Sequence, residues 1–371
     1  MKKILLITIV GSVLAAVAAI GAPQPLMSVA APAQTECDCS KLKDLQLELR
    51  NALKLQQAFT SKIPDLRAMS RESAAIAFAN FAKSVATTVT RPANDKGPSA
   101  IDYISRGDGV SPDDQGKVAG QGLCLKSDNA ELALRDLDSG ASCPGIAKAV
   151  HAHEDYHQSE CTRLTYMVYR EKHPADRAAE EAAAYGVQIA ALRAEIGKVL
   201  EYANVRIETE VNSRMTMPPN PLYTALLVDN HAAVPMSVVP VSGEVIKLEG
   251  KGEQTNNASV EGNCKFTGGL PFTLTALATL ETDGLDAQIR FRNEGTHPSM
   301  VMECTMPGGT GHGMSVPVNA SGGNVPVMNL PLENGAEKVF DQSSGEGAKM
   351  IAGSGVRVTG TAKIRLIFCE K

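Results

Sequence analysis

The chain has 371 residues, of which 43% are hydrophobic and 21% charged, a composition that excludes collagen-like, wholly disordered and polytopic membrane proteins. The 36 basic and 41 acidic residues give a formal net charge of −5, so no basic excess exists to neutralise phosphates and we expect no nucleic-acid partner. The length indicates about two domains.

The N-terminus has the layout of an export signal. Met1-Lys2-Lys3 is a short basic start, residues 4–20 are apolar or small, and small residues continue toward residue 33. This pattern is typical of a cleaved signal peptide, so we expect residues 1–33 to be removed and the mature chain to be periplasmic or secreted. An uncleaved N-terminal anchor is the alternative, although the run is short for a spanning helix. Apart from the signal, we expect no membrane contact.

Cysteine usage agrees with export. An even number of cysteines in an exported chain predicts disulfides rather than free thiols. The eight are Cys37, Cys39, Cys124, Cys143, Cys161, Cys264, Cys304 and Cys369. Three of them follow residue 220, so at least one bridge must join the two halves if all pair within the chain.

The pairing itself stays open at this point. Cys143 and Cys161 would lie about 27 Å apart on one straight helix, so they cannot pair with each other unless that helix is broken. Cys124 with either of them remains possible, as does Cys37 or Cys39 with Cys161.

Residues 37–88 are expected to form a helical hairpin. Pro64 should interrupt the first helix, and a second is predicted over Ser70–Thr88. The hairpin either packs on the rest of the chain or forms a short intermolecular coiled coil, for which the seam has few heptads. The seam of the first helix, broken only by a glutamine, is Leu42, Leu45, Leu49, Ala52, Gln56 and Phe59.

Residues 89–216 are expected to form a zincin-like metal-binding domain. Its first part is rich in Gly, Pro, Asp and Ser, with short extended pieces predicted at Ala100–Ile104 and Lys117–Lys126. Pro144 opens a predicted helix to about Glu171, and Pro174 opens another to about Val205, because Pro is preorganised for the first helical turn. A Pro-rich linker follows at residues 217–221.

The pattern after Leu222 is that of short strands separated by turns. Such spacing predicts an antiparallel sandwich or a closed antiparallel sheet. We expect a β-sandwich-like domain over residues 222–371, so that the fold class is α+β multidomain, with the helical part first. The predicted strands are Thr224–Val228, Pro235–Val241, Glu244–Leu248, Phe272–Leu280, Leu285–Arg292, Met300–Cys304, Val325–Leu330 and Val356–Phe368.

One motif carries chemistry. His153-Glu154-Asp155-Tyr156-His157 is H-E-x-x-H inside a predicted helix. Residues four apart share a helix face, so both imidazoles can reach one Zn²⁺ at about 2.0–2.1 Å. Glu154 would then face a water on the metal and act as general base. The alternative is a solvated His/Glu face without metal.

A catalytic zinc needs a third protein ligand. Gln158-Ser159-Glu160 follow the motif, which removes the three-histidine version. On the next helix, at about 100° per residue, Glu181 lies about 40° from Tyr185 on the apolar seam and Glu180 about 140° away. Glu181 is therefore the expected ligand and Glu180 a solvated charge.

Two further side chains have open roles. Tyr185 either supports the site, by a hydrogen bond to it or to a substrate oxyanion, or is a core tyrosine. Cys161 lies four residues after His157, so it is either a disulfide partner or a metal ligand. No Asp stands in a position to orient His153 or His157.

These residues resemble the zincin-like metallopeptidases, in the gluzincin arrangement of H-E-x-x-H with a downstream helical Glu; the matching residues are His153, Glu154, His157 and Glu181. The segment is also similar to exported or toxin-associated bacterial metallopeptidase-type domains, in which the motif precedes a helix of the form Glu-x-x-Ala-Tyr-x-x-Gln-Ile. Residues 181–189 have that form. The resemblance covers about residues 120–205 and implies a zinc site and hydrolysis of a peptide or protein substrate.

Three functions compete at this stage. The first is an exported zinc metallopeptidase with Glu154 as base. The second is a non-catalytic exported protein with a structural or degenerate zinc site, whose β domain binds a partner such as a cell-surface polymer. The third is another zinc hydrolase, such as one acting on peptidoglycan cross-links.

Export has a direct test. The mature chain should begin between Ala22 and Cys37 and contain few free thiols, because an oxidising compartment favours disulfides. N-terminal sequencing and a thiol assay under denaturing conditions check both points. Finding most of the eight cysteines reduced would contradict export.

Overall fold

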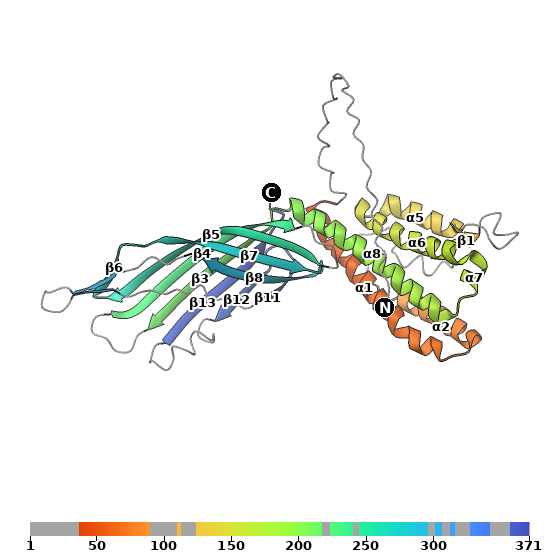
Figure 1. Cartoon of the computed structure of the whole chain (residues 1–371), viewed down its shortest axis with the longest axis horizontal. Helices are drawn as coiled ribbons and strands as arrows, with labels where there is room; N and C mark the ends of the chain where they lie inside the picture. Colours follow the sequence, from red (N-terminus) through yellow and green to blue (C-terminus); the bar gives the residue numbers. More distant parts are fainter. Residues whose placement is uncertain are drawn as a thin grey trace, which may run out of the picture. The chain divides into compact units, whose positions relative to one another are not determined.

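The computed structural model describes residues 37–89, 110–112, 124–216, 223–239, 245–295, 301–305, 312–315, 327–341 and 357–370 (Figure 1). The expected signal peptide, the strand at Ala100–Ile104 and the linker at residues 217–221 lie outside these residues. Within them the protein is mixed α and β, with the helices preceding a large antiparallel sheet. The proposed domain boundaries stay a prediction.

The helices follow the sequence pattern except at residues 128–140, which form a helix in the stretch rich in Gly, Pro, Asp and Ser where no helix was predicted. After a 3-10 turn at Cys39–Lys41 they are α1 (Leu42–Arg67), α2 (Arg71–Ala86), α5 (Asp128–Gly140), α6 (Pro144–Leu164), α7 (Tyr166–Arg170) and α8 (Pro174–Tyr202). Pro64 does not interrupt α1, which runs one turn further because the completely buried Leu66 anchors its end. The helix predicted to reach Glu171 is broken at Thr165, whose φ of 69° is outside the helical range, so that α7 is a separate turn.

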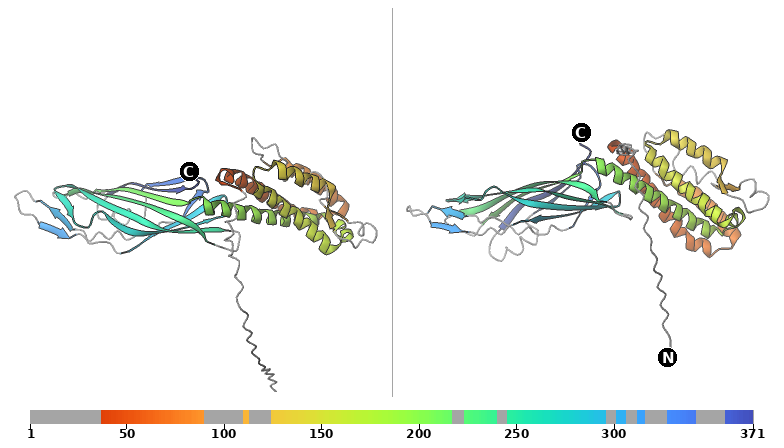
Figure 2. Two further views of the ribbon diagram at one scale, coloured as in Figure 1. Left: turned by 90° about the horizontal axis from the view of Figure 1, so that it is seen from above. Right: turned by 45° about the horizontal axis from the view of Figure 1, so that its top comes forward.

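The apolar seam of α1 packs against α8, and the two helices lie side by side in both views of Figure 2. Leu45, Leu49 and Phe59 are fully buried, as are Leu192 and Ile196 of α8. Burial within one chain leaves this seam no room for a second copy, so the coiled-coil alternative is wrong. The polar break in the seam is accommodated by a hydrogen bond from Gln56 Nε2 to the Ala182 carbonyl, at 3.3 Å.

Eight strands form one continuous antiparallel sheet in the order β11-β8-β7-β5-β4-β3-β13-β12. Their bounds are β3 Arg206–Thr216, β4 Tyr223–Val239, β5 Ile246–Gly262, β7 Phe272–Thr282, β8 Asp286–Glu294, β11 Met328–Pro331, β12 Glu337–Asp341 and β13 Arg357–Ile367. A small three-stranded sheet contains β6 (Cys264–Thr267), β9 (Val301–Cys304) and β10 (His312–Ser315). A two-stranded sheet contains β1 (Val110–Pro112) and β2 (Cys124–Lys126), at the end of the extended piece expected over Lys117–Lys126.

The large sheet curls on itself. Laid flat, eight strands would hold the two edges, β11 and β12, about 34 Å apart. Only residues 332–336 join those edges, and such a link spans no more than about 22 Å. The expected sandwich of two sheets is therefore replaced by one curled sheet, although antiparallel β structure itself is confirmed.

Two strand predictions also need correction. The segments predicted at Thr224–Val228 and Pro235–Val241 belong to the single strand β4. No element was predicted for residues 206–216, between the helix expected to end at about Val205 and the linker, where the structure has strand β3. Its alternation is hidden from the sequence because two of its five alternating, less exposed positions, Thr209 and Ser213, carry polar side chains.

A turn of the sheet is held by the helices. Gln46 of α1 is buried, and its Nε2 donates to the carbonyls of Gly284 and Leu332 at 3.1 and 2.8 Å. Arg193 Nε of α8 donates to the Asp283 carbonyl. Gly284 has a φ of 100°, which L side chains rarely adopt, and a Cβ atom at this position would clash with Leu49 of α1. The turn between β7 and β8 therefore belongs to the same apolar core as α1 and α8.

All eight cysteines are paired, as Cys37–Cys143, Cys39–Cys369, Cys124–Cys161 and Cys264–Cys304. The prediction that a bridge joins the two halves is confirmed by Cys39–Cys369, and Cys143 and Cys161 do not pair with each other. Complete pairing is typical of exported proteins.

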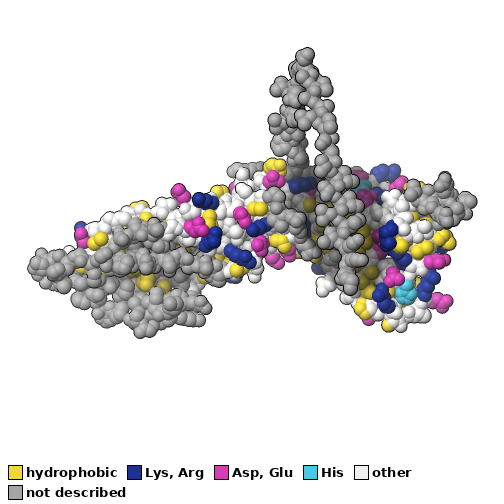
Figure 3. Space-filling model, in the orientation of Figure 1, with side chains coloured by type: hydrophobic (Ala, Val, Ile, Leu, Met, Phe, Trp, Pro, Cys, Tyr) yellow, Lys and Arg dark blue, Asp and Glu magenta, His cyan; other side chains and the backbone are white. Residues whose placement is uncertain are grey.

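Among the described helices, none combines the length and the apolar character needed to cross a membrane. On the face in Figure 3, basic and acidic side chains are interspersed.

Replacing Gln46 by Leu should lower the free energy of unfolding by about 2–6 kcal/mol, because it removes the donor of two buried carbonyls at a cost of about 1–3 kcal/mol each. Urea denaturation measures the loss. The control is Gln56→Leu, which removes one longer hydrogen bond from a half-buried side chain and should cost less than about 1 kcal/mol. Equal losses would show that the hydrogen bonds of Gln46 are unimportant.

Candidate metal centre

The H-E-x-x-H segment lies on the buried face of α6. His153, Glu154 and His157 are only 5%, 5% and 6% exposed. The alternative of a solvated helix face is therefore wrong. Pro144 starts the helix, and the preceding Cys143 is covalently tied to Cys37, which fixes where α6 begins.

Glu181 of α8 faces the two histidines. The Nε2 atoms of His153 and His157 lie 3.2 Å apart, and Glu181 Oε2 lies 3.7 Å and 3.6 Å from them. The predicted ligand set is thus brought together from two helices, and the three side chains could hold one metal ion.

The spacing suits zinc. Ligand atoms about 2.05 Å from a tetrahedral Zn²⁺ lie about 3.3 Å from one another, close to the three distances found here. Glu181 Oε2 is buried and has no hydrogen-bond partner among the described residues, so it is an acceptor left for a cation. Two imidazoles and a carboxylate are a common donor set for catalytic zinc.

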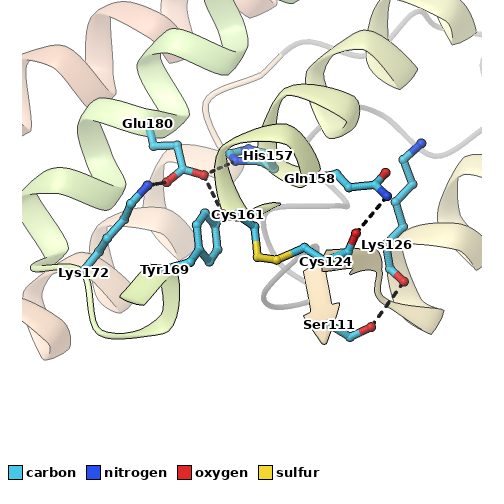
Figure 4. The surroundings of a disulfide bond; sticks show 9 residues. All are labelled: Ser111, Cys124, Lys126, His157, Gln158, Cys161, Tyr169, Lys172 and Glu180. Carbon is cyan, nitrogen blue, oxygen red and sulfur yellow. Dashed lines mark hydrogen bonds and ion pairs between the residues drawn. A yellow bond between two sulfur atoms is a disulfide. The ribbon is translucent and has the colours of Figure 1, made fainter. Parts of the chain in front are cut away.

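Glu180 is not a solvated charge, and that prediction is wrong. Its side chain is 5% exposed, and Oε1 lies 2.8 Å from His157 Nδ1 (Figure 4). The Tyr169 hydroxyl donates to the same oxygen, and Lys172 Nζ binds Oε2. The prediction considered only the side of α8 that faces α6. Tyr169 of α7 and Lys172 cover the neighbouring side of α8, on which Glu180 lies.

Glu180 is the carboxylate that orients His157, a role for which the sequence offered no Asp. Its pKa is lowered despite burial, by hydrogen bonds from His157, Lys172 and Tyr169, so it is an ionised carboxylate that can only accept. His157 must then donate through Nδ1, which leaves the Nε2 lone pair aimed at the metal position once the ring is neutral.

The site without metal favours a proton in place of the cation. Burial alone would lower the pKa of His157, but the charge of Glu181 and the hydrogen bond with Glu180 hold it well above its usual value. The pKa of Glu181 is lowered, because the two histidines outweigh its burial. The negative charge of the two glutamates therefore attracts a positive charge to this position.

Tyr185 is a core tyrosine, and no hydrogen bond from it to the site is found among the described residues. It is a core residue at 1% exposure, stacked on Phe59 at 6.0 Å between ring centroids. Its ring also packs edge-on against His153 at 4.5 Å, which restricts the rotation of that imidazole. Its hydroxyl has no hydrogen-bond partner among the described residues, and burial raises its pKa well above the usual value, so it stays neutral.

Other side chains are now assigned. Cys161 pairs with Cys124 and is not a metal ligand. The sequence analysis did not identify Tyr169 and Lys172, which bind Glu180, because nothing in their spacing links them to the motif.

Comparison with known proteins adds no relative, since no family model, curated protein or solved structure matches this chain.

The purified protein should bind about one zinc per chain, and its affinity should fall as the pH is lowered, by about tenfold per pH unit once the pH is below the raised pKa of His157. The reason is that zinc must displace a proton from His157, whose pKa is raised, and protons compete better at low pH. Titration against a chromophoric chelator at several pH values measures the affinity. Binding that does not vary with pH would place the metal elsewhere.

Proposed function

We propose that this chain is an exported zinc-dependent metallopeptidase of zincin-like type. The observation that carries the proposal is the convergence of His153 Nε2, His157 Nε2 and the unpartnered Glu181 Oε2 on one buried point, with Glu154 next to the first histidine. Export is supported by the complete pairing of the cysteines.

Each residue has a role in this proposal. Zinc, when bound, would supply a Lewis acid that polarises a peptide carbonyl and lowers the pKa of a water. His153, His157 and Glu181 would hold it. Glu154 would take the proton of the attacking water and pass it to the leaving amine. Tyr185 would keep the ring of His153 in place through their edge-on contact.

The substrate would be a peptide or protein. In this proposal the curled sheet contributes to recognition, either of the substrate or of a cell-surface partner.

A non-catalytic zinc site is the second candidate. The observation that favours it is the burial of Glu154 together with both histidines, since a base that meets substrate and water needs access to them. In that case zinc would act as a cross-link between α6 and α8 and would contribute folding energy.

Replacing Glu154 by Gln separates the two candidates. The change removes the base and keeps the size of the side chain, so zinc should stay bound while peptide hydrolysis falls about 10²–10⁴-fold. The measurement is cleavage of a peptide library at matched zinc content. Unchanged hydrolysis would assign the activity to another site, and absence of hydrolysis in the unaltered protein would favour the structural role.

Two controls accompany this variant. Glu201→Gln makes the same change at an exposed position near the far end of α8, about five turns from Glu181, and should leave hydrolysis unchanged. Glu181→Ala should instead lose zinc, because two histidines alone form a weak site.

A further inference from the structure

The carboxylate of Glu180 is held from three directions. It receives His157 Nδ1 and the Tyr169 hydroxyl on Oε1, and Lys172 Nζ on Oε2. Lys172 also lies over the ring of Tyr169, 4.6 Å from its centroid. With both oxygens engaged, the carboxylate cannot rotate away from His157 unless Tyr169 or Lys172 gives way.

Tyr169 in turn depends on a disulfide. It lies on α7, which has only five residues and is too short to be a stable helix by itself. Tyr166 and Tyr169 pack on a small apolar cluster formed by Val110 and the bridged Cys124 and Cys161. Figure 4 shows the ring of Tyr169 between this disulfide and Glu180. The cluster is separate from the main core, so the disulfide is the covalent part of the support of α7.

We propose that the Cys124–Cys161 disulfide is a positioning element of the zinc site, acting through Tyr169 and Glu180 on His157. The inference rests on the zinc site proposed above. Glu180 fixes the Nδ1–H tautomer and the ring orientation of His157, and the disulfide holds the tyrosine that keeps Glu180 in place. Losing such an outer partner of a ligand histidine typically weakens metal binding 10–100-fold.

A second route from the disulfide to the site must be distinguished. Cys161 is one helical turn after His157 on α6, so the bridge could act by holding that end of the helix. The two routes differ in one respect: only the first requires Glu180. Combining the loss of the disulfide with the loss of the carboxylate therefore separates them.

The experiment measures zinc affinity of the mature chain by competition with a chromophoric chelator. Replacing Cys124 and Cys161 together by Ser should weaken zinc binding about tenfold, and Glu180→Ala, which leaves no acceptor for His157 or Tyr169, should weaken it 10–100-fold. In the Glu180→Ala background, removing the disulfide should cause little further loss. The matched control replaces Cys264 and Cys304, which join β6 to β9, and should leave the affinity unchanged.

Tyr169→Phe provides a milder variant if the chain without the disulfide does not fold. It keeps the bridge and the ring but removes the hydroxyl that binds Glu180. It should weaken zinc binding severalfold in the unaltered chain and have no effect in the Glu180→Ala chain. In ¹⁵N NMR of the zinc-loaded protein, the Nδ1–H tautomer of His157 should be seen and should be perturbed by Glu180→Ala, which a purely structural role of Glu180 would not produce.

The outcomes are distinct. Equal losses with and without Glu180, or unchanged affinity after removal of the disulfide and of the Tyr169 hydroxyl, would overturn the inference. Zinc binding with the expected coupling but without hydrolysis would refute the peptidase and leave the inference standing. Failure of the unaltered chain to bind zinc would refute both.

Discussion

Two adjacent glutamates, the buried Glu180 and the partly buried Glu181, lie against His157, and this constraint organises the helical part of the protein. Ionised carboxylates are costly to bury unless each is paired. Glu180 meets the requirement with His157, Tyr169 and Lys172. Glu181 meets it with the two imidazoles at 3.6 and 3.7 Å, and one of its oxygens still lacks a hydrogen bond. The two carboxylates therefore differ in what they contact: Glu180 orients His157, and Glu181 has an oxygen available to a cation.

This arrangement requires α6 and α8 to stay in contact, and the rest of the chain supplies the means. The seam of α1 packs along α8, while Cys37–Cys143 ties the segment before α1 to the start of α6. Gln46 and Arg193 hold the turn between β7 and β8. Helix α8, which carries Glu181, thus shares a buried core with the sheet, so loss of packing at Gln46 or Leu49 should also disturb the position of Glu181.

Burial makes the electrostatics of the site strong. In a region that excludes water, the attraction between the carboxylates and a cation is screened less than at the surface. The same burial of His153, Glu154 and His157 limits the access of a substrate, so the site can bind zinc without catalysing hydrolysis. A zinc ion there would stabilise the fold whether or not it is catalytic, because it is bound by the folded chain only.

Local periodicity was enough to predict α1, α2, α6 and α8, the shared face of His153 and His157, and Glu181 as the third side chain. These follow from the geometry of a single helix, which the sequence determines by itself. The environment of Glu180 could not be predicted, because whether a helix side is solvated depends on what packs there, and α7 is placed by a break at Thr165 and by a distant disulfide. The curl of the sheet was likewise decided by tertiary structure, since alternation fixes the faces of a strand but only pairing between strands decides whether eight of them form one sheet or two.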